Sequence, residues 1–448
     1  MGRLFGTDGI RGVANTELTP ELAVGLGRAL VRTLREEGVG RPRVVIGRDP
    51  RVSGEMLEGA LLAGVCSAGG DVVPVGVLPT PGVAFLTVHL GASSGAMISA
   101  SHNPVDDNGI KFFGADGFKL TDGKEERIEE LLQLSDEARP TGAALGRVTP
   151  EPQAVDAYVE HLVATGGDLT GLRVVVDCAE GAAFAVAPEV LRRLGCDVTA
   201  THAAPTGTNI NDGCGSTHPE TVARAVREHG ADVGLAHDGD ADRLIAVDHT
   251  GAVVDGDAIL ALLAERMHAA GRLDTVVTTV MTNLGFHQAM DRLGIKVLST
   301  KVGDRYVLEA MRAHGHPLGG EQSGHVILTD HATTGDGILT AVQLLTAVAE
   351  TGRPLADLAG VMRRLPQVLL NVRNVDRERL ADAARLWEAV RQEEAALDGS
   401  GRVLVRASGT EQLVRVMVEA DSQDRAEAVA ERLAAVAADE LRIVPSGA

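Results

Sequence analysis

The chain has 448 residues, a length that predicts two to four domains and excludes a single small binding module. Hydrophobic residues make up 44% and charged residues 23% of the chain, a composition that excludes disordered, collagen-like and membrane classes. The net charge of -20 and the aromatic content of 2% argue against partners such as nucleic acid or an anionic membrane.

The cysteines and the N-terminal residues indicate a cytoplasmic protein. The four cysteines lie far apart without a C-x-x-C spacing, and a chain of this length does not need disulfides to fold. We therefore expect the protein to reside in the reducing cytoplasm. The first residues contain no apolar stretch, Gly6 stands where a myristoylation motif needs Ser or Thr, and no run of 18 apolar residues occurs. We expect no export signal, lipid anchor or membrane-spanning helix.

The first predicted helix begins at Thr19-Pro20-Glu21. Thr19 can cap it, Pro20 suits the first turn, and the Glu21 carboxylate faces the positive end of the helix dipole. We expect this helix to end near Gly38.

Strands and helices then alternate, which is typical of parallel sheets with crossover helices. Three strand–helix–strand units are predicted, with first strands at 43–47, 172–178 and 275–281 and helices at 53–67, 187–194 and 286–293. They suggest three similar α/β domains. Any α/β protein can show this order by chance, and periodicity does not decide between the two interpretations.

The last part of the chain has a different order of elements. A strand at 368–372, a helix at 377–395, two strands flanking 407–412 and a helix at 425–437 predict a small α+β domain. We expect domains at 1–145, 146–250 and 251–366 (α/β) and at 367–448 (α+β), with linkers at 138–149, 248–256 and 363–366.

A loop after the strand-like residues 96–98 carries Ser99-Ala100-Ser101-His102-Asn103-Pro104 and is followed by Lys111. A hydroxyl beside an imidazole can serve as a nucleophile with a nearby base. The alternative is a Ser/Asn turn that closes a strand.

A second loop, Asp238-Gly239-Asp240-Ala241-Asp242-Arg243, lies between two predicted strands. Carboxylates at three alternate positions can converge on one hard cation such as Mg²⁺ or Ca²⁺. An EF-hand would need Gly and Glu where Arg243 and His249 stand. A solvated acidic turn remains the alternative.

A third site combines 301–305 with Gly319-Gly320-Glu321-Gln322-Ser323-Gly324-His325. Glu321 and Ser323 in a glycine-flanked loop suit hydrogen bonding to sugar hydroxyls, whereas a plain hairpin connection is the alternative.

The fourth site is a predicted hairpin that contains Arg406, Ser408, Gly409, Thr410 and Arg415. Guanidinium groups, hydroxyls and glycine-exposed amides form a phosphate cradle, and a polar hairpin turn is the alternative. Two more stretches, 5–12 with Arg11 and 47–51, place arginines among turn residues. Taken together, these sites hold what phosphoryl transfer on a sugar requires.

The motifs FGTDGIRG, ISASHNP, DGDADR, GGEQSGH and RASGTE occur in an order and spacing that resemble the α-D-phosphohexomutase superfamily over essentially the whole chain. The length, the 208–220 stretch and Gln322 are similar to the branch that acts on glucosamine phosphates. The resemblance implies three related α/β domains with mixed sheets and a smaller α+β C-terminal domain around a central cleft.

The resemblance also implies residue roles. Ser101, and not Ser99, would be the phosphorylated serine. Asp238, Asp240 and Asp242 would bind one Mg²⁺ per subunit together with a phosphate oxygen on Ser101. Arg11 and Lys111 would contact the reacting phosphate, and both Lys111 and His102 remain candidates for proton transfer. Substrate contacts are implied for Arg243, Glu321, Ser323 and His325, and for Arg406, Ser408, Gly409, Thr410 and Arg415 at the other phosphate.

The implied reaction interconverts glucosamine 6-phosphate and glucosamine 1-phosphate through phosphoserine and a 1,6-bisphosphate, with a hexose 1,6-bisphosphate as activator. The product would supply the synthesis of UDP-N-acetylglucosamine and of cell-wall precursors. We expect the enzyme to be a monomer or a homodimer. The alternative within the superfamily is a phosphomannomutase or phosphoglucomutase. A metal-dependent phosphatase would leave the C-terminal cradle unexplained, and a non-catalytic sugar-phosphate sensor would not need Ser101 with three carboxylates. Ala407 and Gln412 stand where prolines are common in related loops, a departure that leaves the phosphate donors in place.

Overall fold

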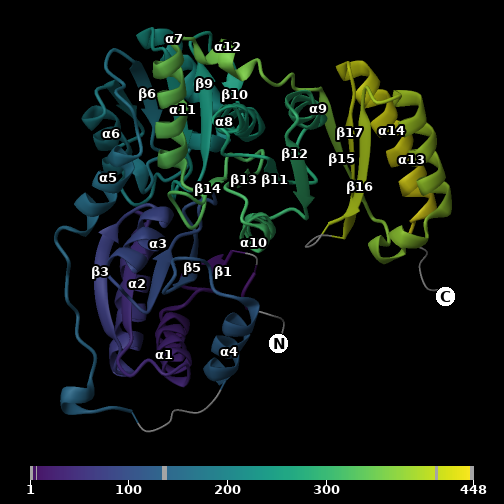
Figure 1. The fold of residues 1–448 in the computed structure, drawn as a ribbon. Helices are drawn as coiled ribbons and strands as arrows, with labels where there is room; N and C mark the ends of the chain where they lie inside the picture. Colours follow the sequence, from purple (N-terminus) through teal and green to yellow (C-terminus); the bar gives the residue numbers. More distant parts are fainter. Residues whose placement is uncertain (1–3, 7, 134–138, 409–411, 444–448) are drawn as a thin grey trace, which may run out of the picture. The chain divides into compact units, whose positions relative to one another are not determined.

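The computed structural model describes residues 4–6, 8–133, 139–408 and 412–443 (Figure 1). The chain forms two compact units. The first comprises residues up to Met281 together with Gly294–Val361, and the second comprises Thr282–Leu293 together with residues from Met362 onward. No helix of the described residues is both long and apolar enough to cross a lipid bilayer.

The first unit begins with a mixed five-stranded sheet and its helices. These elements are β1 (Ile10–Val13), α1 (Pro20–Glu36), β2 (Arg43–Arg48), α2 (Val52–Ser67), β3 (Asp71–Val77), α3 (Thr80–His89), β4 (Ser94–Ile98), β5 (Asp107–Gly114) and α4 (Asp122–Gln133). The strand order is β1-β5-β4-β2-β3, with β2 parallel to its neighbours and β5 antiparallel to its neighbours. As predicted, the Thr19 hydroxyl caps α1 by accepting the Leu22 N–H at 3.2 Å.

Alternation along the strands decides which helices cover each face of this sheet. Val44 and Ile46 of β2 belong to the core formed with α1, α2 and α4. Gly47 lies on the opposite face, where an added Cβ would stand 2.5 Å from Val83 of α3. On β4, an added Cβ at Gly95 would stand 2.2 Å from Thr87 of α3. These two glycines let α3 approach the sheet closely.

Two further sheets of the first unit repeat this arrangement. The elements around the second sheet are η1 (Gly142–Ala144), α5 (Ala154–Ala164), β6 (Arg173–Asp177), α6 (Ala183–Arg193), β7 (Asp197–Thr201), η2 (Gly215–Thr217), α7 (Pro219–His229), β8 (Val233–His237), β9 (Leu244–Asp248) and β10 (Val253–Val254). Those around the third are α8 (Gly256–Ala269), β11 (Thr275–Thr279), β12 (Lys296–Thr300), α10 (Asp304–His314), β13 (Leu318–Gly320), β14 (Val326–Leu328), α11 (Gly337–Thr351) and α12 (Leu355–Ala359).

The strand orders are β10-β9-β8-β6-β7 and β12-β11-β13-β14. In all three sheets a parallel edge pair joined by a helix is followed by another parallel strand and then by an antiparallel strand: β3-β2-β4-β5, β7-β6-β8-β9 and β12-β11-β13-β14. The predicted three related α/β folds are therefore confirmed, and the repeats are not a chance alternation.

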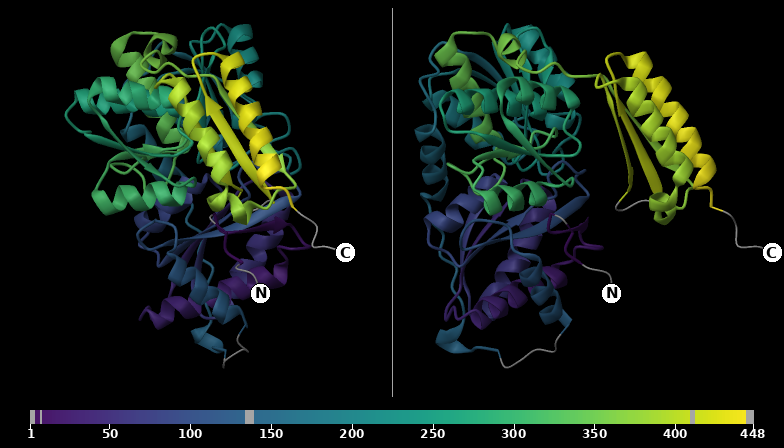
Figure 2. Two further views of the ribbon diagram at one scale, coloured as in Figure 1. Left: turned by 90° about the vertical axis from the view of Figure 1, so that its right-hand side faces the viewer. Right: turned by 45° about the vertical axis from the view of Figure 1, so that its right-hand side comes forward.

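The second unit is the predicted α+β fold. Its elements are α9 (Leu284–Leu293), β15 (Gln367–Arg373), η3 (Arg377–Asp382), α13 (Ala384–Leu397), β16 (Arg402–Ala407), β17 (Leu413–Glu419) and α14 (Gln423–Glu440). The strands form an antiparallel sheet in the order β15-β17-β16, and α13 and α14 pack along it (Figure 2). The helix α9 joins this unit because buried Glu419 accepts the Leu284 N–H at 2.8 Å.

The structure differs from the sequence prediction at two elements. The predicted helix 377–395 is a 3₁₀ turn, η3, and a separate helix, α13, divided at Ala383. The division lets both Leu380 and Ala383 enter the core, and Trp387 Nε1 donates to the Leu380 carbonyl at 2.8 Å. The segment 248–256 contains strand β10, which pairs with β9 and so extends the second sheet beyond residue 250.

Candidate active site

Loops from all three sheets of the first unit meet at one buried cluster. The loop after β4 supplies Ser101, the loop after β8 supplies Asp238, Asp240 and Asp242, and the loop after β13 leads to His325. Each loop follows the carboxyl end of a strand, which is the usual position of sites in α/β proteins.

Ser101 connects the first two loops. Its hydroxyl donates a 2.6 Å hydrogen bond to Asp238 Oδ2 and lies 3.2 Å from His102 Nδ1. The residue is 1% exposed and has a φ of 52°, in the left-handed region that residues other than glycine seldom adopt. Gly239 makes this approach possible, since an added Cβ there would stand 2.4 Å from the Ser101 carbonyl oxygen.

Ser99 has a different environment. Its hydroxyl donates to Asp49 Oδ2 at 2.6 Å and accepts the N–H of Ser101 at 2.9 Å. The Ser99 hydroxyl therefore stabilises the backbone of the Ser101 loop. Among the described residues it has no hydrogen bond to the acidic loop. This arrangement favours Ser101 over Ser99 as the reactive hydroxyl.

The acidic loop fits a divalent cation. One carboxylate oxygen from each of Asp238, Asp240 and Asp242 lies within 4.8 Å of the other two. Within the described part of the chain, Oδ1 of Asp240 and Oδ1 of Asp242 are buried without a hydrogen-bond partner. Buried, unpaired carboxylate oxygens are costly, and a hard cation such as Mg²⁺ would satisfy them.

The three carboxyls differ in charge state because their neighbours differ. Burial opposes ionisation of Asp240, but Lys111 lowers its pKa to about 2. Burial, followed by repulsion from Asp240 and Asp238, raises the pKa of Asp242 to about 7. Burial and the charge of Asp240 also raise the pKa of Asp238. Because the three carboxyls repel one another when ionised, a bound cation would favour ionisation of all three.

Lys111, on β5, forms an ion pair with this loop. Its Nζ lies 2.9 Å from Asp240 Oδ2 and 3.4 Å from Asp8 Oδ2. Burial disfavours the ammonium, yet Asp240 and Asp8 hold the pKa of Lys111 above its ordinary value. Arg11 also pairs with Asp8, so a positive group from β1 and one from β5 lie beside the same carboxylate.

His102 lies beside Ser101, with Nδ1 at 3.2 Å from the hydroxyl. Burial, helped by the charges of Arg243 and Arg11, lowers the pKa of His102 to about 4. The imidazole is therefore neutral at physiological pH and can accept a proton. Arg243 remains charged, because Asp238 and Asp242 raise its pKa against the effect of burial.

The Glu321 loop faces this cluster from the third sheet. Glu321 Oε1 accepts the N–H of Gly303 at 3.0 Å, and burial with the charge of Asp304 raises the Glu321 pKa. The Ser323 hydroxyl is buried without a hydrogen-bond partner among the described residues. His325 Nε2 lies 3.9 Å from Asp242 Oδ2, which joins this loop to the acidic loop. These groups can bind the hydroxyls of a polar ligand.

Sequence reasoning missed three members of the cluster: Asp8, Lys119 and Asp304. Lys119 Nζ lies 2.6 Å from Asp8 Oδ1 and 2.5 Å from Asp304 Oδ2, and so connects the N-terminal stretch to α10. Asp8 and Asp304 belong to the stretches 5–12 and 301–305 that the sequence had singled out, whereas no local pattern marked Lys119.

The predicted cradle lies in the second unit, on the hairpin formed by β16 and β17. Arg406 and Arg415 occupy directly opposite positions on the two strands, and Arg415 lowers the pKa of Arg406 after the larger effect of burial. Ser408 is buried, with its N–H bonded to the Leu413 carbonyl at 3.0 Å. Opposed like charges destabilise a sheet, and an anion between them would relieve the repulsion. Gly409 and Thr410 lie outside the described residues.

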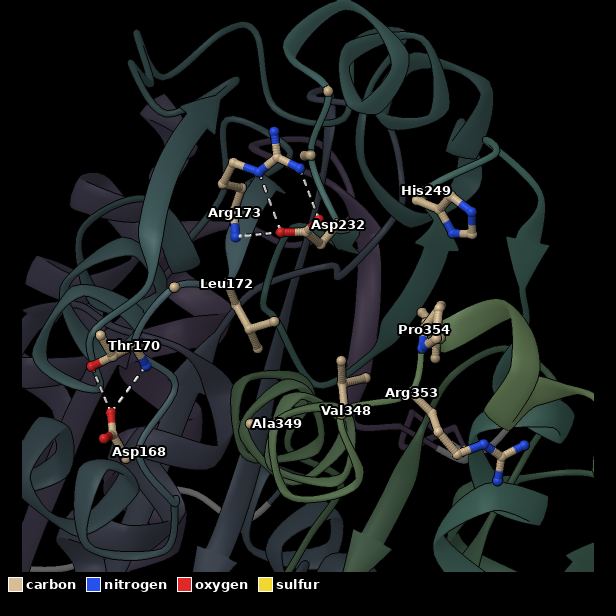
Figure 3. Close-up of a pocket in the computed structure, with 15 residues that line it drawn as sticks. Asp168, Thr170, Leu172, Arg173, Asp232, His249, Val348, Ala349, Arg353 and Pro354 are labelled. Carbon is tan, nitrogen blue, oxygen red and sulfur yellow. Dashed lines mark hydrogen bonds and ion pairs between the residues drawn. The ribbon is translucent and has the colours of Figure 1, made fainter.

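Two other features lie at the two ends of β6. A cavity of about 700 Å³ opens at the start of β6, where Arg173 pairs with Asp232 at 2.9 Å (Figure 3). It lies at the opposite end of β6 from the clustered loops. At the end of β6, Asp177, His202 and Cys214 place ligand-type atoms within 4.8 Å of one another. Asp177 there accepts the N–H groups of Ala179 and Gly215, so its carboxylate holds two turns together.

Comparison with protein families identifies four consecutive domains along the chain. They are described as phosphoglucomutase/phosphomannomutase domains I, II, III and the C-terminal domain, and they match residues 2–139, 156–251, 255–365 and 369–436. All four domains occur in the order expected for the resemblance found in the sequence.

Curated relatives match over nearly the whole chain. A phosphoglucosamine mutase from Symbiobacterium thermophilum is 58% identical, covering 99% of this chain and 100% of its own. A phosphoglucosamine mutase from Saccharopolyspora erythraea is 59% identical, covering 98% and 99%.

Solved structures share the fold. A phosphoglucomutase/phosphomannomutase family protein from Burkholderia thailandensis superposes with a TM-score of 0.83 at 28% identity, covering 99% of both chains. An N-acetylphosphoglucosamine mutase from Aspergillus fumigatus, solved with GlcNAc-6P and magnesium, superposes with a TM-score of 0.71 at 18% identity, covering 98% of this chain and 96% of its own.

Proposed function

This chain belongs to the phosphoglucosamine mutase branch of the phosphoglucomutase/phosphomannomutase family, and we propose that it interconverts glucosamine 6-phosphate and glucosamine 1-phosphate. The net reaction exchanges the phosphorylated position of the sugar, which makes the chain an isomerase. The observation that carries the proposal is the 2.6 Å hydrogen bond from the Ser101 hydroxyl to Asp238, within a loop fitted for a cation. The names of the relatives favour this substrate over mannose or glucose phosphates.

In the first half-reaction, phosphorylated Ser101 donates its phosphoryl group to O1 of glucosamine 6-phosphate. The bond from phosphorus to Ser101 Oγ breaks and a bond to the sugar O1 forms. The proton lost from O1 is balanced by the proton that Ser101 Oγ takes up. In the return transfer, when Oγ attacks the bisphosphate and gives up its proton, the neutral imidazole of His102, 3.2 Å from Oγ, would accept that proton.

Lys111 and Arg11 stabilise the moving phosphoryl group. Lys111 stays charged between Asp240 and Asp8, so we assign it the role of a fixed positive charge and assign proton exchange at Ser101 to His102. Preorganised charges of this kind lower the barrier because they do not need to reorient during the reaction. Arg11, paired with Asp8, would offer its guanidinium to the same oxygens as a second positive group.

Asp238, Asp240 and Asp242 would hold one Mg²⁺ with an oxygen of the phosphoserine. When bound, the ion neutralises negative charge on the phosphoryl group. The chain's own contribution is a rigid set of oxygens, since the Thr80 hydroxyl donates to Asp240 Oδ2 at 2.6 Å and keeps that carboxylate oriented. The magnesium named with the Aspergillus fumigatus structure supports this choice of cation.

The resulting glucosamine 1,6-bisphosphate must then turn around, so that its other phosphate returns to Ser101. Glu321 and Ser323 would bind the sugar 3- and 4-hydroxyls in both orientations, with Arg243 and His325 as further contacts. Arg406, Ser408, Gly409, Thr410 and Arg415 would hold the phosphate that is not transferred. The opposed pair Arg406 and Arg415 supports this role, because a phosphate dianion offsets two adjacent positive charges.

A hexose 1,6-bisphosphate would activate the enzyme by phosphorylating Ser101. The product would feed synthesis of UDP-N-acetylglucosamine and cell-wall precursors. We keep the cytoplasm as the expected location, since all four cysteines are free thiols in the described structure. The functional form would be a monomer or homodimer.

A coupled assay with glucosamine, glucose and mannose 6-phosphates, each at the same concentration, tests the substrate. We expect the largest kcat/KM for the glucosamine compound. A larger kcat/KM for either neutral sugar would reject the proposed substrate and leave the family membership intact.

A further inference from the structure

Two side chains, one beside the first sheet and one beside the second, donate hydrogen bonds to the same two carbonyl groups of the Ser101 loop. Arg51 Nη2 donates to the carbonyl oxygens of Ser101 and Asn103 at 2.9 and 2.8 Å. Asn211 Nδ2 donates to the same two oxygens at 2.9 and 3.1 Å. Arg51 directly precedes α2 beside the first sheet, whereas Asn211 lies between β7 and η2 beside the second. The backbone of the Ser101 loop is therefore held by one side chain beside each of the first two sheets.

Arg51 is committed to this loop. Its side chain is fully buried and pairs with Asp49 at 2.9 Å, while Nη1 donates to the carbonyls of Pro104 and Asp107. The guanidinium of Arg51 therefore donates to the Asp49 carboxylate and to protein carbonyls. The other arginine of the 47–51 stretch, Arg48, pairs with Glu55 and Glu58.

Asn211 is held from its own backbone. Its N–H donates to the Ala179 carbonyl at 2.9 Å, and the Ala179 N–H donates to buried Asp177 at 2.9 Å. Asn211 has a φ of 58°, a conformation that asparagine tolerates better than most residues. The amide nitrogen is thus presented to the Ser101 loop by a turn anchored at the end of β6.

We infer that Asn211 and Arg51 are positioning residues for phosphoryl transfer, which hold the carbonyl of Ser101 so that its Oγ points at Asp238 and His102. Ser101 has a left-handed φ of 52°, which its surroundings must impose. A released carbonyl would let the residue relax, and Oγ would leave the line between phosphorus and the acceptor oxygen. This inference rests on the proposed role of Ser101.

The variant Asn211→Gly tests it, since glycine accepts the left-handed conformation and removes only the amide. Asn209→Gly is the matched control. Asn209 lies in the same stretch, but its side chain bonds to Thr206 and to the Ala204 carbonyl and not to the Ser101 loop. Both variants lose one amide from one segment, so a difference between them reports the contact with the Ser101 loop.

For Asn211→Gly we expect kcat to fall by about tenfold or more, as for a reacting group misplaced by a fraction of an ångström, with KM within twofold of the parent enzyme. The rate at which glucose 1,6-bisphosphate phosphorylates Ser101, followed by intact-protein mass spectrometry, should fall by the same factor. Asn209→Gly should change neither rate by more than twofold. Asn211→Asp, which keeps the shape but replaces the donor by a carboxylate, should be at least as slow.

Equal kcat and phosphorylation rates in Asn211→Gly, Asn211→Asp and Asn209→Gly would overturn the inference, as would a loss confined to KM. The parent enzyme separates this failure from failure of the proposed function. If the parent does not acquire phosphate on Ser101, the proposed role of Ser101 itself is wrong. If the parent does so and the Asn211 variants match the control, only the positioning role is wrong.

Discussion

The Ser101 hydroxyl and the Asp238 carboxylate are joined by a 2.6 Å hydrogen bond although 137 residues separate them in the chain. One residue follows β4 of the first sheet, and the other follows β8 of the second. Thr80, the first residue of α3, also ties the first sheet to the acidic loop, because its N–H donates to the Asp240 carbonyl at 3.0 Å and its hydroxyl to the Asp240 carboxylate. The proposed nucleophile and the proposed cation-binding loop are therefore aligned by packing between sheets.

We predict that Ser101→Ala removes mutase turnover, because the residue loses the oxygen that carries phosphate. Ser99→Ala should remain active at a reduced rate, since Ser99 only supports the Ser101 N–H and contacts Asp49. Intact-protein mass spectrometry with peptide mapping measures the phosphate on each variant. Phosphate on Ser99 in the parent enzyme would reject this assignment.

We predict that activity depends on Mg²⁺ bound by Asp238, Asp240 and Asp242. Replacing any one with Asn should weaken Mg²⁺ binding, measured by titration calorimetry, and slow phosphoryl transfer. Asp248→Asn is a suitable control, because this carboxylate at the end of β9 accepts the N–H groups of Thr250 and Ala252 and the Thr250 hydroxyl, all outside the acidic loop. Full activity in metal-free, EDTA-treated enzyme would contradict the prediction.

Arg415→Ala should raise KM and also lower kcat. A weaker hold on the distal phosphate lets some bisphosphate escape, which leaves Ser101 without its phosphoryl group. Added glucose 1,6-bisphosphate should restore part of the activity by rephosphorylating Ser101. Arg432→Ala, which removes an exposed pair with Glu393 in the same unit, should leave the kinetics unchanged. Normal kinetics in Arg415→Ala would rule out the role of this arginine.

The cysteines should differ in reactivity. Burial raises the pKa of Cys196 to about 12 and that of Cys214 to about 12, and it raises the pKa of Cys178 as well. The reactive form is the thiolate, so a raised pKa lowers its fraction at pH 8, and alkylation should speed up as the pH rises toward these pKa values. At pH 8, partly exposed Cys66 should react first with iodoacetamide in peptide mapping. Alkylation of Cys214 as fast as that of a solvent-exposed thiol with an ordinary pKa would contradict this prediction.

The sequence by itself determined the local elements and the reactive loops. Alternating apolar runs with turn residues between them predicted the three strand–helix–strand units, and Thr19 was identified as a helix cap. The DGDADR loop identified three carboxylates that converge, because alternate residues of a tight loop can point to one side. Such features depend on residues a few positions apart, so a short window of sequence contains the information.

Only the tertiary structure decided which distant side chains meet. Lys119 bridges Asp8 and Asp304, and Asn211 binds the carbonyl of Ser101, across 111, 185 and 110 residues of chain. The resemblance in sequence selects Ser101 over Ser99, but only packing shows that the Ser99 hydroxyl turns toward Asp49 and the Ser101 hydroxyl toward Asp238. These contacts depend on the register and packing of separate sheets, which many weak, long-range interactions determine together and no local pattern records.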